Sequence, residues 1–593
     1  MSRPSLDEFR ATGKYESDLN GMEWYFWRWA CWKVFEANQP DADHSDAAAG
    51  IVAFVTPSSF LNGRAFAGMR EYLRRQCDKG WIINLSPEGN RPPGNTRVFS
   101  REVGRQLSIA VFVRSVEANP EQSAEVRYLA LRGTREEKLG RLDTIGPAGP
   151  DWRLCRTGSR SSFRPEPTQT WDVYPALGEL MPMRSRGVTA GRSWVYAPTP
   201  EILRSRWECF IAADVPRRRT MFHETKRYKI DREYPALPGF PRRVGSLAHE
   251  TGPCPEPVRV AYRSFDRQWL IPDKRLIAEA RTGLWQVRGE HQIFVSEQDV
   301  QQIESGPGLV FTGLIPDIDH FSGWGGSGVH PLWRDPMGQR PNFAAGLLGY
   351  LNARLGMMIS PLDLLAYVAA LVAHPAYTAK FRYELEEPGI RVPLSADPSL
   401  WQAAIPLGRE VIWLHTYGAR CIDPAAGRSA GERSIIERQS IKSTHGVAAL
   451  PGRLSDQLAY DPDTRILHFG TGSFSPVPQP VVEYDVAGRR VLWRWLNDRT
   501  PHPRYKNRTC PELDDMTVTS WNRRLVEEFL ALLTVLTGCV SIEGSQQNLL
   551  DQVCDAPTIT VDDLREAHVV LARAGRSEPR RPSDATAPAL FLA

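Results

Sequence analysis

A dense group of basic residues lies near the middle of the sequence, in the stretch "PRRRTMFHETKRYKIDR" that starts at residue 216. Guanidinium and ammonium groups bind DNA phosphates, which fixes a protein on the duplex without specifying sequence. A solvated, charged surface loop gives the same pattern, because a run of charges alone does not specify a ligand. The predicted DNA-contacting residues of this run are Arg217, Arg218, Arg219, Lys226 and Arg227.

A second set of charged residues lies among aromatic side chains in "YRSFDRQW", residues 262–269. Arg263 and Asp266 are close enough in sequence to form an internal ion pair that orients the fold. Arg267 is the residue of this stretch that we predict to reach DNA. The alternative, which we favour, is a structural role for all three side chains.

The loop "EGNRPPGNTR" supplies four more polar side chains, Asn90, Arg91, Asn95 and Arg97. The loop follows a predicted strand, so these side chains are expected at the open end of an α/β sheet, where ligands bind. We predict DNA contact here, beside the pocket for a target base. An ordinary surface loop is the alternative.

Three other stretches resemble metal-binding or cofactor-binding motifs but lack the additional ligands, strand or helix that such sites need. "PDIDHF" groups Asp317, Asp319 and His320, but no second cluster has ligand spacing, so no metal is predicted. "FGTG" at 469–472 follows a strand but precedes no helix, and "GWGGSG" at 323–328 follows no strand; both are predicted to be turns or loops. The sequence contains no P-loop.

Bulk properties set the class of protein that must position these residues. The 593 residues suggest about two to four domains. The net charge of +4 is too small to indicate a nucleic-acid partner by itself. Nine cysteines without a CxxC pair favour reduced thiols and a cytoplasmic location. The longest apolar run near the start, 24–35, is too short for a bilayer, so no membrane partner is predicted.

Apolar runs separated by turn signals predict part of an α/β sheet in the first 120 residues. "IVAFVTP", residues 51–57, has the unbroken apolar pattern of a parallel strand covered on both faces. Further strands are predicted at 81–85 and 107–114, and helices at 21–37, 64–76, 361–374 and 408–418. A final helix is predicted from a cap at Ser520 to a stop at Gly538.

Residues 21–114 resemble the second half of a class I methyltransferase domain of the DNA adenine-N6 type. The resemblance lies in the aromatic helix, "FVTPSSFL", "GMREYL" and the strand pair "WIINL" and "LSIAVFVR". The downstream chain resembles the C-terminal specificity region of type ISP restriction–modification enzymes, in "VAYRSFDRQWL", "SPLDLLAYVAALVAHPAYTAKF", "LGREVIWLH" and "VEYDVAGRRVLWRWLNDR". The resemblance implies the C-terminal part of a Rossmann-like sheet followed by a mixed α+β target-recognition region.

Enzymes of that family bind S-adenosylmethionine on a Gly-rich turn and carry a catalytic (Asn/Asp/Ser)-Pro-Pro-(Tyr/Phe) motif. The motif binds an adenine that is flipped out of the duplex. The only Pro-Pro pair here is Pro92–Pro93, which lies between Arg91 and Gly94 and so departs from the motif. No catalytic or cofactor-binding residue is therefore predicted in this chain. S-adenosylmethionine is expected mainly on an N-terminal methyltransferase half, supplied by a partner chain or another restriction or defence subunit.

The expected domains are the catalytic-domain half at 1–120, a connecting region with the basic run at 121–257, the specificity region at 258–570 and a disordered tail at 571–593. The favoured function is a part of a site-specific DNA adenine-N6 methyltransferase acting on double-stranded DNA in a restriction–modification or phage-defence system. A non-catalytic DNA-specificity subunit and an inactive truncated remnant are the alternatives.

Overall fold

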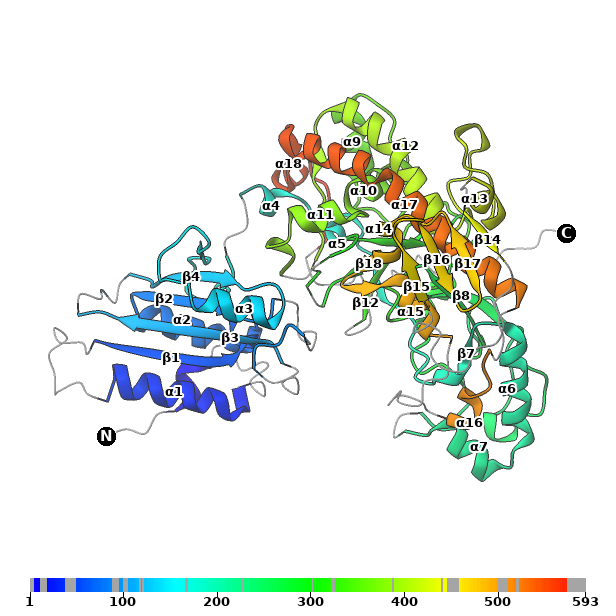
Figure 1. Cartoon of the computed structure of the whole chain (residues 1–593), viewed down its shortest axis with the longest axis horizontal. Coiled ribbons are helices and arrows are strands. Elements are labelled where there is room, and N and C mark those ends of the chain that lie inside the picture. Colours follow the sequence, from blue (N-terminus) through cyan, green and yellow to red (C-terminus); the bar gives the residue numbers. More distant parts are fainter. Residues whose placement is uncertain are drawn as a thin grey trace. The chain divides into compact units, whose positions relative to one another are not determined.

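The computed structural model describes residues 5–10, 19–37, 49–87, 95–99, 105–116, 119, 122–165, 169–225, 228–300, 302–303, 305–321, 326–386, 389–438, 441–444, 458–499, 510–518 and 522–572. The chain forms two compact units, unit 1 (1–169) and unit 2 (170–593). Together they make a mixed α/β fold whose strands form several small sheets (Figure 1). The predicted tail beyond 572 lies outside the described residues.

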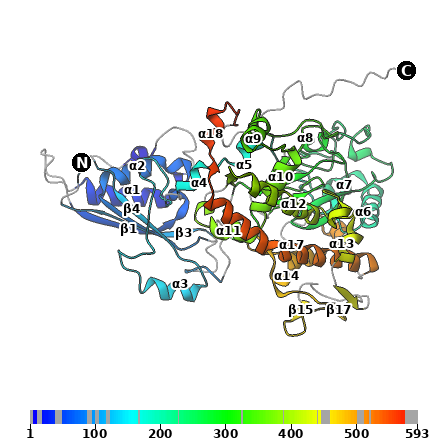
Figure 2. The same cartoon turned by 90° about the horizontal axis from the view of Figure 1, so that it is seen from above.

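Unit 1 is built on a five-stranded sheet in the order β1-β3-β2-β4-β5. β3 is antiparallel to both β1 and β2, so it lies between two strands that run in the same direction. Figure 2 shows α1 and α2 on one face of this sheet and α3 on the other. The elements are α1 (Met22–Phe35), β1 (Gly50–Pro57), α2 (Ala67–Gln76), β2 (Lys79–Asn84), β3 (Leu107–Arg114), β4 (Glu125–Ala130), α3 (Arg135–Leu142) and β5 (Arg153–Leu154).

Alternating burial along β3 explains why one face of the sheet is well packed. Ala110 and Phe112 point to the side of α1 and α2 and are fully buried. Trp27 of α1 packs on Phe54 with ring centroids 4.9 Å apart and donates a 3.0 Å hydrogen bond to Thr56 Oγ1. These contacts fix α1 over the β1 end of the sheet.

The outer side of this same end is apolar and exposed. Four α1 side chains with helical i, i+3, i+4 and i+7 spacing are between 53% and 71% exposed. We call Met22, Tyr25, Phe26 and Trp29 the α1 stripe. Ile51 and Val55 of β1 are also exposed, and β3 is the one strand that pairs with β1 among the described residues. Exposed apolar groups of this size on a monomer often mark an interaction surface, and an edge strand can pair with another chain.

The expectation that residues 51–57 form a parallel strand covered on both faces is therefore wrong. The described partner of β1 is antiparallel, and part of the strand is exposed. The physical reason is that an apolar run shows which side chains favour burial, but it does not show which segment covers them.

Long helices form the main core of unit 2. α17 (Arg523–Asp555) packs against α10 (Pro361–Val372), α12 (Pro398–His415), α13 (Glu432–Arg438) and α14 (Gln479–Glu483). α17 is long and apolar enough to cross a membrane by length and composition, but most of its apolar window is buried in this core. Its composition is thus accounted for as that of a core helix.

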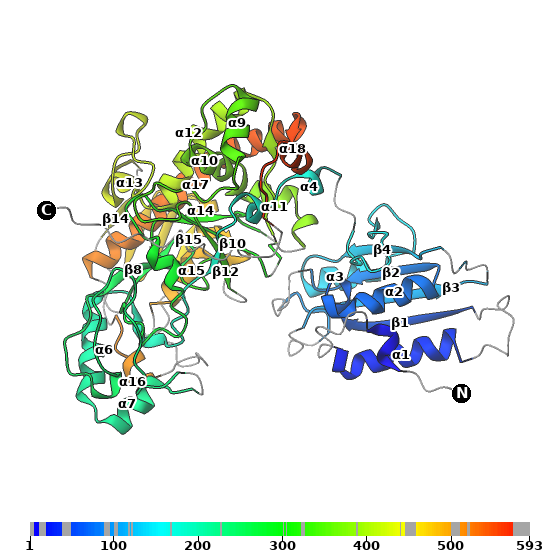
Figure 3. The same cartoon turned by 180° about the vertical axis from the view of Figure 1, so that it is seen from behind.

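Unit 2 contains three sheets of three or four strands (Figures 1 and 3). One has the order β11-β10-β12-β6, a second β14-β17-β16-β15, and a third β7-β9-β8. Their strands are β6 (Ser185–Arg186), β7 (Tyr196–Ala197), β8 (Val258–Arg263), β9 (Asp266–Leu270), β10 (Phe294–Gln298), β11 (Val310–Thr312), β12 (Ser327–Pro331), β14 (Lys442–Thr444), β15 (Leu458–Asp461), β16 (Ile466–Phe469) and β17 (Gly472–Ser475). "FGTG" is the turn between β16 and β17, as predicted.

Smaller elements complete unit 2. Figure 1 shows α6, α7 and α16 together beside β7. These and the remaining elements are α4 (Gln169–Val173), α5 (Leu177–Leu180), α6 (Pro200–Ala212), α7 (Val215–Phe222), α8 (Thr282–Gln286), α9 (Leu347–Leu355), α11 (Pro375–Lys380), β13 (Leu394–Ser395), β18 (Asp485–Val486), β19 (Arg489–Arg490), α15 (Val491–Asn497), α16 (Pro511–Asp514), β20 (Thr558–Ile559) and α18 (Val561–Glu566).

The predicted end of the last helix at Gly538 is also wrong, because α17 continues to Asp555. Ser520 lies outside the described residues, and Asn522 caps the helix by accepting a hydrogen bond from Leu525 N. A Cβ at position 538 would lie 2.6 Å from Leu414 Cδ2. The glycine therefore serves close packing against α12 rather than helix termination.

Gly408 permits a similar close approach between α12 and α10, since a Cβ there would lie 1.7 Å from the Ala366 carbonyl oxygen. Gly408→Ala is expected to lower the free energy of unfolding by about 1–3 kcal/mol, because the two helices must separate. Gly349 of α9 is exposed with open space around it, so Gly349→Ala is the matched control and is expected to stabilise by about 0.4–1 kcal/mol. Urea unfolding measures the free energy of unfolding of both variants. Equal effects of the two substitutions would contradict the packing argument.

Candidate nucleic-acid interface

The β8–β9 hairpin carries the charged residues of "YRSFDRQW" into the interior of unit 2. Asp266, at the start of β9, accepts a 2.8 Å hydrogen bond from the Arg499 guanidinium, and both side chains are almost fully buried. Arg499 also lies over the Trp495 ring, 3.4 Å from its centroid. This ion pair joins the hairpin to the segment after α15.

Arg263 has a different partner from the predicted one. Its guanidinium binds Asp317 at 2.5 Å and lies 3.5 Å from Asp319, so the expected Arg263–Asp266 pair is not formed. Asp317 also accepts a 2.7 Å hydrogen bond from Tyr196, and burial raises the pKa of this carboxyl group. Asp317 and Asp319 are thereby engaged by protein groups.

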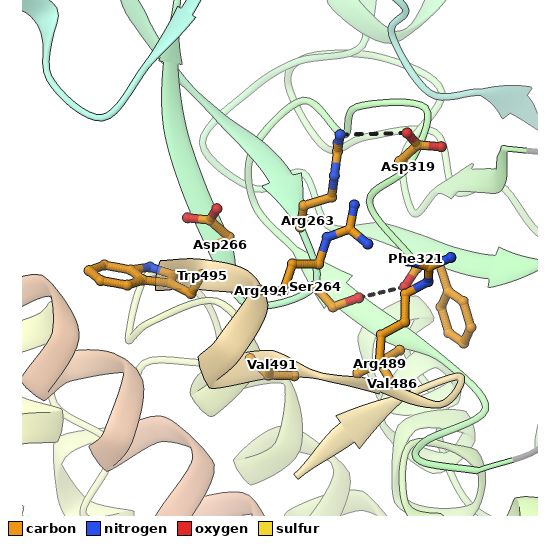
Figure 4. A pocket seen from close by; sticks show the side chains of 10 residues that line it. All are labelled: Arg263, Ser264, Asp266, Asp319, Phe321, Val486, Arg489, Val491, Arg494 and Trp495. Atoms are coloured by element: carbon orange, nitrogen blue, oxygen red, sulfur yellow. Dashed lines mark hydrogen bonds and ion pairs between the residues drawn. The ribbon is translucent and has the colours of Figure 1, made fainter. Parts of the chain in front are cut away.

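A group of arginines lies on the other side of the hairpin turn. Figure 4 shows Arg263 of β8, Arg489 of β19 and Arg494 of α15 around Ser264 and Phe321. We call these three arginines the guanidinium cluster. The cavity among them measures about 20 Å³, enough for about one water molecule. Guanidinium groups at such a surface can donate to phosphate oxygens that approach from outside.

His320, the third member of the "PDIDHF" group, is buried against a serine hydroxyl. Its Nδ1 lies 2.8 Å from Ser296 Oγ, and burial, with a smaller effect of Arg263, lowers the pKa of His320 to about 3. The residues that the structure describes contain no group of three histidine, cysteine or acidic side chains able to hold a metal ion.

Arg267, predicted to reach DNA, is mostly buried. It forms a 2.6 Å ion pair with Glu432 and lies over the Tyr417 ring, 3.4 Å from its centroid. A DNA contact by Arg267 stays a prediction, and it would require exchange of the Glu432 partner.

The basic run divides into residues with different surroundings. Arg217 is exposed and pairs with Glu512 at 2.6 Å, while Arg219 pairs with Glu224 and Asp231. Arg218 is buried and donates to the backbone carbonyls of Ile211, Ala213, Leu247, Ala248 and Glu250. Arg218 thus serves the packing of α7, and its guanidinium does not face solvent. Lys226 and Arg227 lie outside the described residues.

The loop after β2 is described only in part. Asn90 and Arg91 lie outside the described residues. Asn95 is exposed, and its carbonyl accepts a 2.9 Å hydrogen bond from Arg135 N at the start of α3. Arg97 is half-buried. The proposed DNA contacts of these four residues stay predictions.

Comparison with known proteins assigns this hairpin region to a family. A family model described as the type ISP C-terminal specificity domain matches residues 179–528, which include β8, β9 and α15. The chain belongs to the type ISP C-terminal specificity domain family. The match begins within the predicted connecting region 121–257 and ends before 570. No curated protein matches the chain.

Solved structures share the fold at low sequence identity. A complex of DrdV with DNA has a TM-score of 0.56 and 18% identity over 93% of this chain and 53% of that chain. The ATP-dependent type ISP restriction–modification enzyme LlaBIII bound to DNA has a TM-score of 0.59 and 14% identity over 94% and 36%. A nuclease-deletion mutant of the type ISP enzyme LlaGI with a DNA substrate mimic has a TM-score of 0.54 and 15% identity over 92% and 41%. The chain thus spans about half or less of each neighbour's length.

The type ISP specificity region contains charged residues that sequence reasoning did not single out. Arg489 and Arg494 lie in the "VEYDVAGRRVLWRWLNDR" segment, and Arg259 and Arg420 lie near Arg267. Basic residues interleaved with tryptophan in that segment were the available signal. Nothing local indicated that α15 and the β8–β9 hairpin lie together.

Proposed function

We propose that this protein recognises the target site of an S-adenosylmethionine-dependent DNA adenine-N6 methyltransferase in a restriction–modification or phage-defence system. Unit 2 binds double-stranded DNA and reads its sequence, and unit 1 contributes the last strands of the catalytic sheet. The observation that carries the proposal is the family match over 179–528, downstream of a unit whose elements resemble a methyltransferase half.

Two further observations support DNA as the partner. The three structural neighbours are named as complexes with DNA or a DNA mimic. The guanidinium cluster contains donors of the kind that bind phosphates, and phosphate contact by Arg263 or Arg494 would require exchange of Asp317 or Asp498. Base-specific contacts would come in addition, since phosphate contacts carry no sequence information.

On this proposal, S-adenosylmethionine and the catalytic motif belong to a further polypeptide that packs on unit 1. Support comes from the exposed α1 stripe and from β1, whose one strand partner among the described residues is β3. A polypeptide that adds a strand to β1 and covers the stripe would satisfy both. Each structural neighbour also contains a large part that this chain does not match.

A methyl-transfer assay tests the proposal. The protein is incubated with DNA and methyl-labelled S-adenosylmethionine, alone and with the product of the upstream reading frame. We expect incorporation only in the mixture. Sequence-specific DNA binding without incorporation in either sample would favour a non-catalytic specificity subunit. Neither binding nor incorporation would favour an inactive remnant. Incorporation by this chain alone would contradict the need for a further polypeptide.

A further inference from the structure

A second cavity, larger than the one in Figure 4, lies on the opposite side of the β8–β9 turn. It measures about 310 Å³ and is bounded by the hairpin, the end of β11, the turn after α12 and the start of α13. This volume is at the lower end of the range for small-molecule sites. We call it the aromatic pocket, because Phe265, Phe311, His415 and Tyr417 all line it.

The pocket contains a buried donor with no partner. His415 is almost fully buried, and its Nδ1 accepts a 3.3 Å hydrogen bond from Phe311 N, so the hydrogen of the neutral ring lies on Nε2. Burial lowers the pKa of His415 to about 3, which keeps the ring neutral. His415 Nε2 has no hydrogen-bond partner among the described residues. Buried donors are nearly always satisfied, so Nε2 is a donor that an acceptor on a bound ligand would satisfy.

The charges around the pocket favour an anion. Arg259, Arg267 and Arg420 line it, opposed by Asp266 and Glu432. Both carboxylates are engaged, Asp266 by Arg499 and Glu432 by Arg267. Arg259 is also paired, with Glu528 at 3.0 Å, so Arg420 is the pocket arginine that has no described carboxylate partner.

The third arginine of the pocket, Arg420, is held by neutral groups. It donates to the backbone carbonyls of Gln292, Ala419 and Gly289, and no described carboxylate lies within ion-pair distance. A Cβ at Gly313 would lie 3.1 Å from the Arg420 guanidinium carbon, so the glycine leaves room for this group. A cation held by neutral carbonyls retains its attraction for an anion.

Two aromatic residues of the pocket have an unusual backbone conformation. Phe265 and Tyr417 have φ values of 58° and 55°, in the left-handed region that bulky residues rarely adopt. The Tyr417 hydroxyl donates a 2.7 Å hydrogen bond to the Phe265 carbonyl, which ties the two positions together. Local strain of this kind is concentrated at binding sites.

We propose that the aromatic pocket binds a single nucleotide, with its base among the aromatic side chains and its phosphate near Arg420. Aromatic walls suit a planar base, His415 Nε2 offers a donor to a base acceptor, and guanidinium groups suit phosphate. The nucleotide is either a free nucleoside monophosphate or one unstacked unit of a bound DNA strand. This proposal does not depend on methyl transfer.

Calorimetric titration of the full chain with the four deoxynucleoside 5′-monophosphates tests it, with inorganic phosphate and nucleosides as comparisons. We expect at least one monophosphate to bind at least 10-fold more tightly than its nucleoside or phosphate. Arg420→Gln should weaken that binding at least 10-fold, and Arg288→Gln, an exposed arginine outside the pocket, should not. No binding, or equal binding of inorganic phosphate, would overturn the proposal.

A photo-crosslink on the unaltered protein covers the case in which Arg420→Gln does not fold. 8-Azido-dAMP should label peptides containing Phe265, Phe311 or Tyr417, whereas labelling confined to other peptides would overturn the assignment. Adding duplex DNA before the photo-label distinguishes the two sources of the nucleotide. Blocked labelling would indicate a nucleotide unit of DNA, and unchanged labelling a free nucleotide.

Discussion

Replacing Arg499 with methionine is expected to lower the free energy of unfolding of unit 2 by about 3–5 kcal/mol. The Arg499 guanidinium is the ion-pair partner of Asp266, and the two side chains are 1% and 2% exposed. Methionine would fill similar space above Trp495 but would leave the Asp266 carboxylate charged and unpaired in the interior. Restoring its solvation requires the β8–β9 hairpin to open, so urea unfolding followed by tryptophan fluorescence should shift to lower denaturant.

An exposed ion pair provides the control for this prediction. Arg433 and Glu437 lie four residues apart on α13 at 2.8 Å, and their side chains are 91% and 64% exposed. Arg433→Met should change the free energy of unfolding by less than about 0.5 kcal/mol, because solvent already screens both charges. If both substitutions had similarly small effects, the Asp266 carboxylate would not depend on Arg499 and the buried-pair argument would fail.

The hairpin also shows where sequence reasoning fails. Arg263 and Asp266 are near neighbours, so local reasoning paired them, but Arg263 binds a carboxylate 54 residues away and Asp266 a guanidinium 233 residues away. Such partners are selected by the packing of distant segments, which no local pattern reports. The aromatic pocket was missed for the same reason, because its walls come from five separate segments.

The periodic spacing of apolar residues predicted secondary structure more reliably than local sequence predicted ion pairs. The strand predicted at 107–114 coincides with β3, and the helix predicted at 361–374 contains all of α10. Both segments are largely buried, so their composition is set by burial itself. Glycine was a less reliable signal of helix ends. Gly538 resembles a helix stop in the sequence, but it lies inside α17 against Leu414.

The surface of unit 1 leads to the second large effect. Trp29 is 54% exposed in the α1 stripe. If a further polypeptide covers this stripe, Trp29→Glu places a charge in an apolar interface. Substitution of an aromatic residue at the centre of an interface costs about 2–4 kcal/mol, or roughly 30–1,000-fold in affinity. Methyl transfer by the mixture of the two polypeptides should fall by that factor when the partner is below saturation.

Folding of the variant itself should be unaffected, since the Trp29 side chain contributes to the surface and not to the core of unit 1. Leu154 is a matched control, because it is 55% exposed on β5, at the opposite edge of the sheet from β1. Leu154→Glu should leave methyl transfer unchanged. Raising the partner concentration should restore activity to Trp29→Glu, because the substitution weakens association without touching the reacting groups. An equal loss in both variants, or a loss that the partner cannot restore, would place the interface elsewhere.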